Sequence, residues 1–168
     1  VRPKVILNCA ASADGKIALS NRQRLKLSNN EDFERVHNLR NKYEAILVGI
    51  GTIIEDDPSL TIEPEYMSAH NPIRIVLDTQ CRTPPNSKIL DGHSETIIAV
   101  GEKTKTTSIP NVEMIRCGVK EIDIPRLLKK LSNRGIKSIL VEGGETVMWS
   151  FLKNGLFDEF NIFISSIV

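Results

Sequence analysis

The feature that most constrains this chain is the stretch 136–146, where an apolar run ends in a carboxylate and two glycines and then becomes helical. An unbroken apolar run as short as 139–141 is typical of a strand buried on both faces. Gly143 and Gly144 leave backbone N–H groups uncovered where a helix begins, and a helix N-terminus favours anions. The stretch predicts a dinucleotide site, although a tight strand-to-helix turn explains a single Gly-Gly pair better.

A second stretch of the same kind favours the nucleotide interpretation. The apolar run 45–49 leads through Gly51 and Thr52 into a short helix that Pro58 stops. Two buried strands that each end in glycines, with Thr52 and Thr146 beside them, can hold both ends of a pyrophosphate through N–H and hydroxyl groups. The pattern is neither a Walker loop, which needs Gly-Lys-Ser/Thr, nor the G-x-G-x-x-G turn of a Rossmann site.

Apolar runs and helical spacings alternate along the whole chain. This alternation predicts an α/β sheet with its ligand beyond the carboxyl ends of the strands, in one domain over 1–168. The last strand alternates apolar and polar residues, which we interpret as an antiparallel edge. The predicted strands are 4–11, 45–49, 73–77, 96–100, 112–116, 139–141 and 158–168, and the predicted helices are 30–43, 52–57, 125–134 and 146–154.

Composition excludes several classes of function. Twenty-two Lys and Arg against 21 Asp and Glu give a net charge of +1, which offers no electrostatic case for nucleic acid or a membrane surface. No apolar run approaches the roughly 20 residues of a membrane span, and no signal peptide is visible, so we expect a cytoplasmic protein. Cys9, Cys81 and Cys117 are widely spaced, so we expect buried or inert thiols and no metal site.

The helix predicted over 30–43 carries an unusual cation. Arg40 falls at the same helical spacing as Phe33, Val36 and His37. A cation among these positions indicates a ligand or a partner carboxylate, with a surface ion pair as the alternative. We interpret His37, which has no second ligand at metal spacing, as a packed or interfacial histidine.

Two loops also carry basic residues. The polar segment 17–27 is expected to form a loop, either over a site or simply solvated. The strand 73–77 ends in Asp78 and Thr79, and Arg82 follows them. An arginine here can meet a ribose 2′-phosphate, although an exposed loop arginine is commoner.

Five motifs in register together resemble the riboflavin-biosynthesis reductase family, which has the dihydrofolate reductase fold. The resemblance covers nearly the whole chain and implies a three-layer sandwich with a mostly parallel sheet. The motifs are Ala11-Ser12-Ala13-Asp14-Gly15-Lys16, Arg40, Val48-Gly49-Ile50-Gly51-Thr52 with Asp56-Asp57-Pro58-Ser59-Leu60-Thr61, Arg74-Ile75-Val76-Leu77-Asp78-Thr79, and Val141-Glu142-Gly143-Gly144.

The resemblance implies an NAD(P)H-dependent oxidoreductase that forms a homodimer. In the family, NADPH delivers a hydride to C1′ of the ring-opened ribose of a phosphorylated ribosylaminopyrimidine, which gives the ribityl chain. We therefore expect NADPH, with NADH as the alternative. The implied cofactor contacts are Ala10, Thr52, Asp56, Asp78, Thr79, Gly143, Gly144, Glu145 and Thr146. The implied substrate contacts are Asn8, Arg40 on the 5′-phosphate, Leu60 and Glu142, and Glu142 is also the catalytic candidate.

The chain also departs from part of the family. It lacks the H-x-E and P-C-x-x-C signature of the zinc deaminase domain in bacterial members, so it resembles the stand-alone archaeal or fungal reductases of the 2,5-diamino pyrimidinone. Bacterial members carry a lysine at Asn8 and an arginine at Glu63. Family chains continue past Val168, so we expect C-terminal strands of the family to be missing here.

Two other functions stay open from the sequence. A different reductase of the same fold would act on a pterin and would need Asp32 or Glu34 as the carboxylate on the first helix. A nucleotide-binding module without turnover is favoured by the lack of a motif-defined general acid. Oxidation of NADPH by candidate substrates separates the three.

Overall fold

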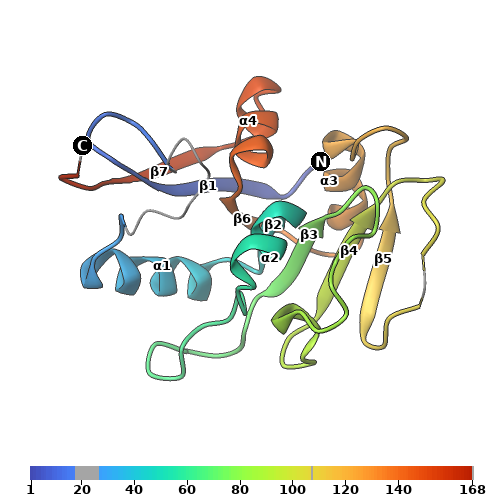
Figure 1. The fold of residues 1–168 in the computed structure, drawn as a ribbon, viewed down its shortest axis with the longest axis horizontal. Helices are drawn as coiled ribbons and strands as arrows, with labels where there is room; N and C mark the ends of the chain where they lie inside the picture. Colours follow the sequence, from blue (N-terminus) through green and yellow to red (C-terminus); the bar gives the residue numbers. More distant parts are fainter. Residues whose placement is uncertain (18–26, 107, 168) are drawn as a thin grey trace.

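The computed structural model describes residues 1–17, 27–106 and 108–167, and the predicted loop 17–27 lies almost wholly outside them. The described residues form one sheet in the order β5-β4-β3-β2-β6-β1-β7, and every neighbouring pair of strands is parallel (Figure 1). The strands are β1 Lys4–Ala11, β2 Ala45–Gly49, β3 Ile73–Leu77, β4 Thr96–Val100, β5 Val112–Arg116, β6 Ser138–Gly143 and β7 Glu159–Ile164; the helices are α1 Asn30–Lys42, α2 Ile50–Asp56, the 3₁₀ turn η1 Lys88–Leu90, α3 Ile124–Asn133 and α4 Glu145–Lys153.

Two hydrophobic layers cover the sheet. Helices α3 and α4 pack on one face, and α2 and η1 pack on the other beside α1. Burying one Leu, Ile or Phe side chain completely stabilises a fold by about 1.5–3 kcal/mol, so these layers dominate the stability. The α3 and α4 layer includes Leu127, Leu128, Leu131, Val147 and Phe151 against Val5, Leu7, Leu47, Ile75 and Ile97, and the α2 layer includes Ile53 and Ile89 against Ile46, Val48, Val76 and Ile98.

Local sequence signals set the helix ends. The side chain of Asn29 accepts a hydrogen bond from the N–H of Asp32 and so caps α1, while Asp123 caps α3 in the same way. Pro125 stands in the first turn of α3, where a missing N–H costs nothing. The predicted helices therefore begin and end within about two residues of the observed ones.

The inward face of α1 is polar, so the largely apolar inward face that the spacing of Phe33 and Val36 predicts is wrong in part. Phe33 is 46% exposed, whereas Asp32 and His37 are buried. The sheet explains the difference, because the strand ends that α1 covers carry polar side chains, as described below. Arg40 is therefore not a lone cation on an apolar face.

The antiparallel edge predicted for the last strand is wrong. β7 pairs with β1 in parallel, from Ile6 opposite Glu159 to Ala11 opposite Ile164. The crossover through α4 brings the chain back to the same end of the sheet before β7 begins, as a parallel pair requires. Alternating burial along β7 reflects an edge strand covered on one face, and that pattern does not depend on strand direction.

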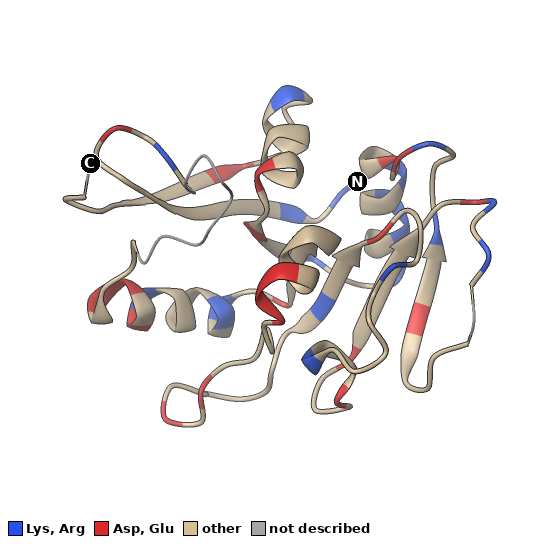
Figure 2. Ribbon diagram, in the orientation of Figure 1, with Lys and Arg blue, Asp and Glu red and all other residues tan. Residues whose placement is uncertain are grey.

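Charges of both signs are interspersed over the elements (Figure 2). None of the helices in the described part of the chain has the length and apolar character that crossing a membrane requires.

Candidate active site

The carboxyl ends of β2 and β6 lie against each other, as the two glycine stretches predict. A Cβ on Gly49 would stand 2.8 Å from Cγ2 of Val147, and a Cβ on Gly144 would stand 3.4 Å from Oγ1 of Thr52. Gly143 has a φ of +133°, which side chains other than hydrogen disfavour, and the Gly143–Gly144 peptide is cis. No side chain in the described ranges caps the start of α4, so its first N–H groups are left for an anion beside Thr52.

Other predicted cofactor residues surround this contact. Asp56 is exposed one helical turn beyond Thr52 on α2, and Glu145 and Thr146 are exposed in the first turn of α4. Ala10 is half-buried near the end of β1. The strand order places the ends of β2, β6 and β1 next to one another, so these residues share one edge of the sheet.

The turn after β3 holds the remaining predicted cofactor residues. Asp78 is fully buried, and its Oδ2 accepts hydrogen bonds from the N–H of Thr83 at 2.8 Å and from Oγ1 of Thr83 at 2.7 Å. Its Oδ1 is buried with no hydrogen-bond partner among the described residues. The carbonyl of Thr79 accepts hydrogen bonds from the N–H of Gly101 and from Oγ1 of Thr104. Asp78 therefore organises the turn that presents Thr79.

Glu142 forms a bidentate ion pair with Arg40. Nε and Nη2 of Arg40 lie 3.0 and 2.7 Å from the two carboxylate oxygens, and Nη1 donates to the carbonyl of Thr61 at 2.7 Å. Burial alone lowers the pKa of Arg40, but the Glu142 carboxylate outweighs it and raises the pKa overall. Glu142 is thus a partner carboxylate for Arg40, which is one of the explanations that the position of Arg40 on its helix indicated.

A β-bulge directs Glu142 towards α1. Leu47 pairs with Val141 and Val48 pairs with Gly143, so Glu142 is the extra residue of β6 between them. Bulges are over-represented beside active sites, where they re-aim a side chain.

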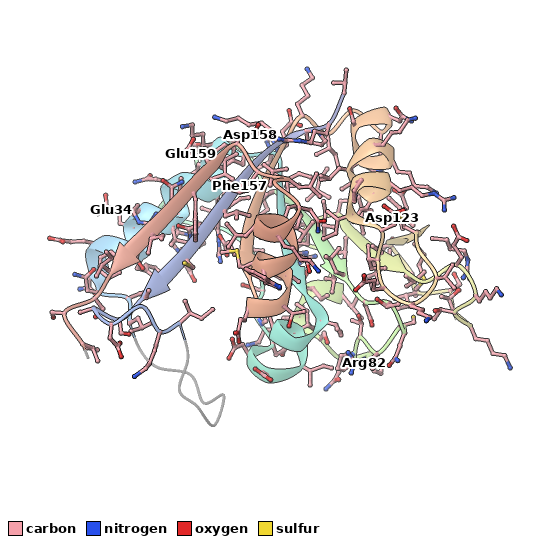
Figure 3. All side chains as sticks on the ribbon, turned by 90° about the horizontal axis from the view of Figure 1, so that it is seen from above. Glu34, Arg82, Asp123, Phe157, Asp158 and Glu159 are labelled. Carbon is pink, nitrogen blue, oxygen red and sulfur yellow. The ribbon has the colours of Figure 1, made fainter. Side chains whose placement is uncertain are left out.

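A second arginine of α1, which the sequence analysis did not single out, holds Asn8 on β1. Nη1 of Arg35 donates to Oδ1 of Asn8 at 2.8 Å, while Nε and Nη2 donate to Oδ1 of Asp32 at 2.9 and 2.7 Å. The side chain of Asp32 is only 1% exposed. Glu34, the other first-helix carboxylate considered from the sequence, is exposed on α1 (Figure 3). The three-residue spacing of Asp32 and Arg35 on one helix face was the available signal.

His37 packs beneath the loop that follows Leu60, which agrees with the prediction of a packed histidine. Its Nδ1 accepts a hydrogen bond from the N–H of Glu63 at 3.2 Å, and its ring stacks on Tyr66 with centroids 5.0 Å apart. Burial, with a smaller effect of Arg40, lowers the pKa of His37. Leu60 has a φ of +52° and its side chain is buried in the α2 layer, so only its backbone can face a ligand.

The fully buried Arg74 fixes the loop before Leu60. It donates to the carbonyls of Ser59 at 3.2 Å and Ser94 at 2.7 Å, and to the carboxylate of Asp91 at 2.9 Å. A buried guanidinium with its donors satisfied is a rigid anchor. It joins the loop before Leu60 to β3 and to the segment after η1.

The three cysteines agree with the expectation of inert thiols. Cys9 and Cys81 are half-buried, Cys117 is buried, and all three are unpaired. Burial raises the pKa of each thiol, so little reactive thiolate is present at neutral pH.

Known proteins resemble this chain in sequence and fold. A model of the RibD C-terminal domain matches residues 3–168. The chain is 37% identical over 173 residues to the 2,5-diamino-6-ribosylamino-4(3H)-pyrimidinone 5′-phosphate reductase of Methanothermobacter thermautotrophicus, covering 100% of this chain and 80% of that protein. It is 34% identical over 179 residues to the protein of the same name from Archaeoglobus fulgidus, covering 99% and 82%.

A solved structure has a similar fold. The crystal structure of the deaminase and 5-amino-6-(5-phosphoribosylamino)uracil reductase of Thermotoga maritima matches with a TM-score of 0.84 and 31% identity, covering 99% of this chain and 46% of that longer chain. The dihydrofolate reductase-like α/β fold predicted from the sequence is confirmed, apart from the direction of β7. The chain belongs to the RibD C-terminal domain family.

Proposed function

We propose that this chain is the NADPH-dependent reductase that converts the ribosyl side chain of 2,5-diamino-6-ribosylamino-4(3H)-pyrimidinone 5′-phosphate to the ribityl form in riboflavin biosynthesis. The observation that carries the proposal is the Arg40–Glu142 pair directly beside the Gly143–Gly144 turn. Two charged side chains that can bind a phosphorylated sugar, Glu142 and Arg40, thus lie next to a glycine turn that can bind a dinucleotide. Archaeal relatives that cover this chain end to end carry the name of this reductase.

The residues at the turn fit a nicotinamide dinucleotide. Glycine at 143 and 144 leaves room that a Cβ would fill, next to the hydroxyl of Thr52 and the uncapped start of α4. Thr52 and these N–H groups would hold the pyrophosphate, with Thr79 and the exposed Asp56 further along the same edge. When bound, the cofactor supplies the hydride for C1′ of the substrate. NADPH rather than NADH is proposed because the exposed Arg82 after β3 (Figure 3) can meet a 2′-phosphate.

On the substrate side, this chain's residues bind and orient the open-chain sugar. The Glu142 carboxylate accepts hydrogen bonds from ribose hydroxyls, which brings C1′ to the end of β6. Of the five N–H groups of Arg40, three donate to Glu142 and Thr61 and none of the other two donates to a described residue, so these two are proposed to meet the 5′-phosphate. The backbone of Leu60 and the side chain of Asn8 complete the set.

The proposal includes a cytoplasmic homodimer in which each copy is a single reductase domain over 1–168. Three apolar side chains on β7, Phe160, Ile162 and Ile164, are 37–68% exposed and offer surface that a second copy would cover. Light scattering of the purified chain tests the dimer.

Oxidation of NADPH by the purified protein tests the function. We expect loss of NADPH absorbance with the phosphorylated diaminopyrimidinone and little with its dephosphorylated form. NADH in place of NADPH tests the nucleotide preference. Binding of NADPH without oxidation by any substrate would instead support a binding module.

A reductase of a pterin is the second candidate, because Asp32 supplies a buried carboxylate in the first turn of α1. Dihydropterin as substrate in the same assay tests it. Turnover of the pterin alone would replace the main proposal.

A further inference from the structure

The contact between Arg35 and Asn8 fixes how the Asn8 amide is turned. Nη1 of Arg35 lies 2.8 Å from Oδ1 of Asn8. A guanidinium carries only hydrogen-bond donors, so the atom of the amide that faces it has to be the carbonyl oxygen. The NH₂ group of Asn8 consequently lies on the opposite side of the planar amide, away from Arg35.

Arg35 is itself held in place by Asp32. Two of its nitrogens donate to Oδ1 of this carboxylate, whose side chain is 1% exposed against 33% for Arg35. Such a buried and charge-assisted contact restricts the rotation of the guanidinium. Asp32, Arg35 and Asn8 thus form a chain of contacts from the first turn of α1 to β1, the strand next to the edge strand β7.

Asn8 stands beside Glu142. The pairing of β1 with β6 ends at Leu7 opposite Val141, and Asn8 and Glu142 are the next residues of the two strands. Both side chains lie on the face covered by α1, because each contacts an arginine of that helix. No described residue accepts a hydrogen bond from Nδ2 of Asn8, a residue only 5% exposed. The NH₂ group of Asn8 is therefore a fixed donor next to the Glu142 carboxylate.

We propose that Arg35, held by Asp32, is a positioning residue that turns the Asn8 amide so that its NH₂ group donates to an oxygen of the substrate's sugar chain beside Glu142. This inference rests on the proposed function. Each arginine holds one substrate-facing side chain in this arrangement. Arg40 binds the acceptor Glu142, and Arg35 binds the donor Asn8. The site then presents one donor and one acceptor side by side to an open-chain polyol, whose hydroxyls can use both.

Four variants test the inference by steady-state kinetics. Asn8→Asp keeps the shape and the bond with Arg35 but removes the donor, and should raise KM for the substrate about tenfold while the Kd for NADPH stays unchanged. Arg35→Met frees the amide and should raise KM by a similar factor. The double variant should be no worse than Asn8→Asp alone, since both changes remove one interaction. Arg35→Lys should recover part of the loss.

A competition experiment identifies the group that Asn8 contacts. The pyrimidine base without its sugar is tested as an inhibitor of the parent and of Asn8→Asp. An unchanged inhibition constant is expected if Asn8 contacts the sugar chain, and a weakened one would overturn that assignment.

The outcome is separable from that of the proposed function. Turnover by the parent protein tests the function, and the variants test the inference only once the parent is active. Thermal unfolding monitors folding of each variant, and Asn8→Asp preserves enough of the local contacts to serve if Arg35→Met does not fold. Wild-type KM in the single variants, or additive effects in the double variant, would overturn the positioning role of Arg35.

Discussion

Replacing Glu142 by glutamine removes one charge of the pair with Arg40 and keeps the size of the side chain. The glutamine carbonyl can still accept one N–H of the guanidinium, but its NH₂ group then faces a second donor. Both side chains are largely buried, at 10% and 16% exposure, so solvent compensates little. A lost hydrogen bond to a charged group costs roughly 1.5–3 kcal/mol, so we expect about 2 kcal/mol of lost stability.

This loss converts to a measurable shift in thermal unfolding. For a chain of this size, 1 kcal/mol corresponds to about 2–4 °C in Tm, so Glu142→Gln should unfold about 4–8 °C lower. If Glu142 also orients the ribose hydroxyls, kcat/KM should fall by roughly 100-fold or more, a loss of the order found for acid–base residues. A retained pH profile in the variant would assign orientation rather than proton transfer to Glu142.

A double variant separates stability from chemistry. Arg40→Met with Glu142→Leu removes both charges and replaces them with apolar groups, which often restores stability at buried ion pairs. We expect a Tm closer to that of the parent than in Glu142→Gln, with activity still lost. Full kcat/KM in Glu142→Gln would refute the reasoning, because the carboxylate would then serve only the fold.

Three more predictions follow from the site. Gly144→Val should abolish NADPH binding and leave the protein folded, because the branched side chain would enter the space next to Thr52; NADPH fluorescence titration measures it, and wild-type affinity would contradict it. Arg40→Met should raise KM for the phosphorylated substrate by roughly 10- to 100-fold without changing the Kd for NADPH; equal activity of the parent on the dephosphorylated substrate would argue against the phosphate contact. The lowered pKa of His37 makes the folded state prefer the neutral ring, so its contribution to stability should be complete above the unfolded pKa of about 6.5 and decline as the pH falls below that value; Tm measured across this range should vary less in His37→Asn than in the parent.

Local sequence patterns reveal most of the fold and only part of the site. The strands 73–77, 96–100 and 112–116 match the structure because short apolar runs between polar loops have few alternatives as strands. The direction of β7 did not follow from its alternation, because burial on one face is common to both directions. The 3₁₀ turn η1 carried no recognisable signal.

The pairing of side chains could not be predicted in the same way. Arg40 and Glu142 are 102 residues apart, and Arg35 and Asn8 are 27 apart, so only the packed fold brings them together. The motif resemblance implied substrate contacts for Arg40 and Glu142, but no spacing indicated that these two residues contact each other. Arg35 was missed because an arginine near a helix start is common on exposed faces.

The polar inner face of α1 has a consequence for motion. Among the described residues, the apolar cluster under this helix contains only Ile6, Tyr43 and Leu140, with Leu39 packed against them, whereas β2 is buried along its whole length. Segments with few buried apolar contacts open locally at lower free energy than the core. We expect the amides of α1 to exchange hydrogen faster than those of β2 and β6, and to slow when substrate binds. The local order of α1, the helix that carries Arg35 and Arg40, would then depend on whether substrate is bound.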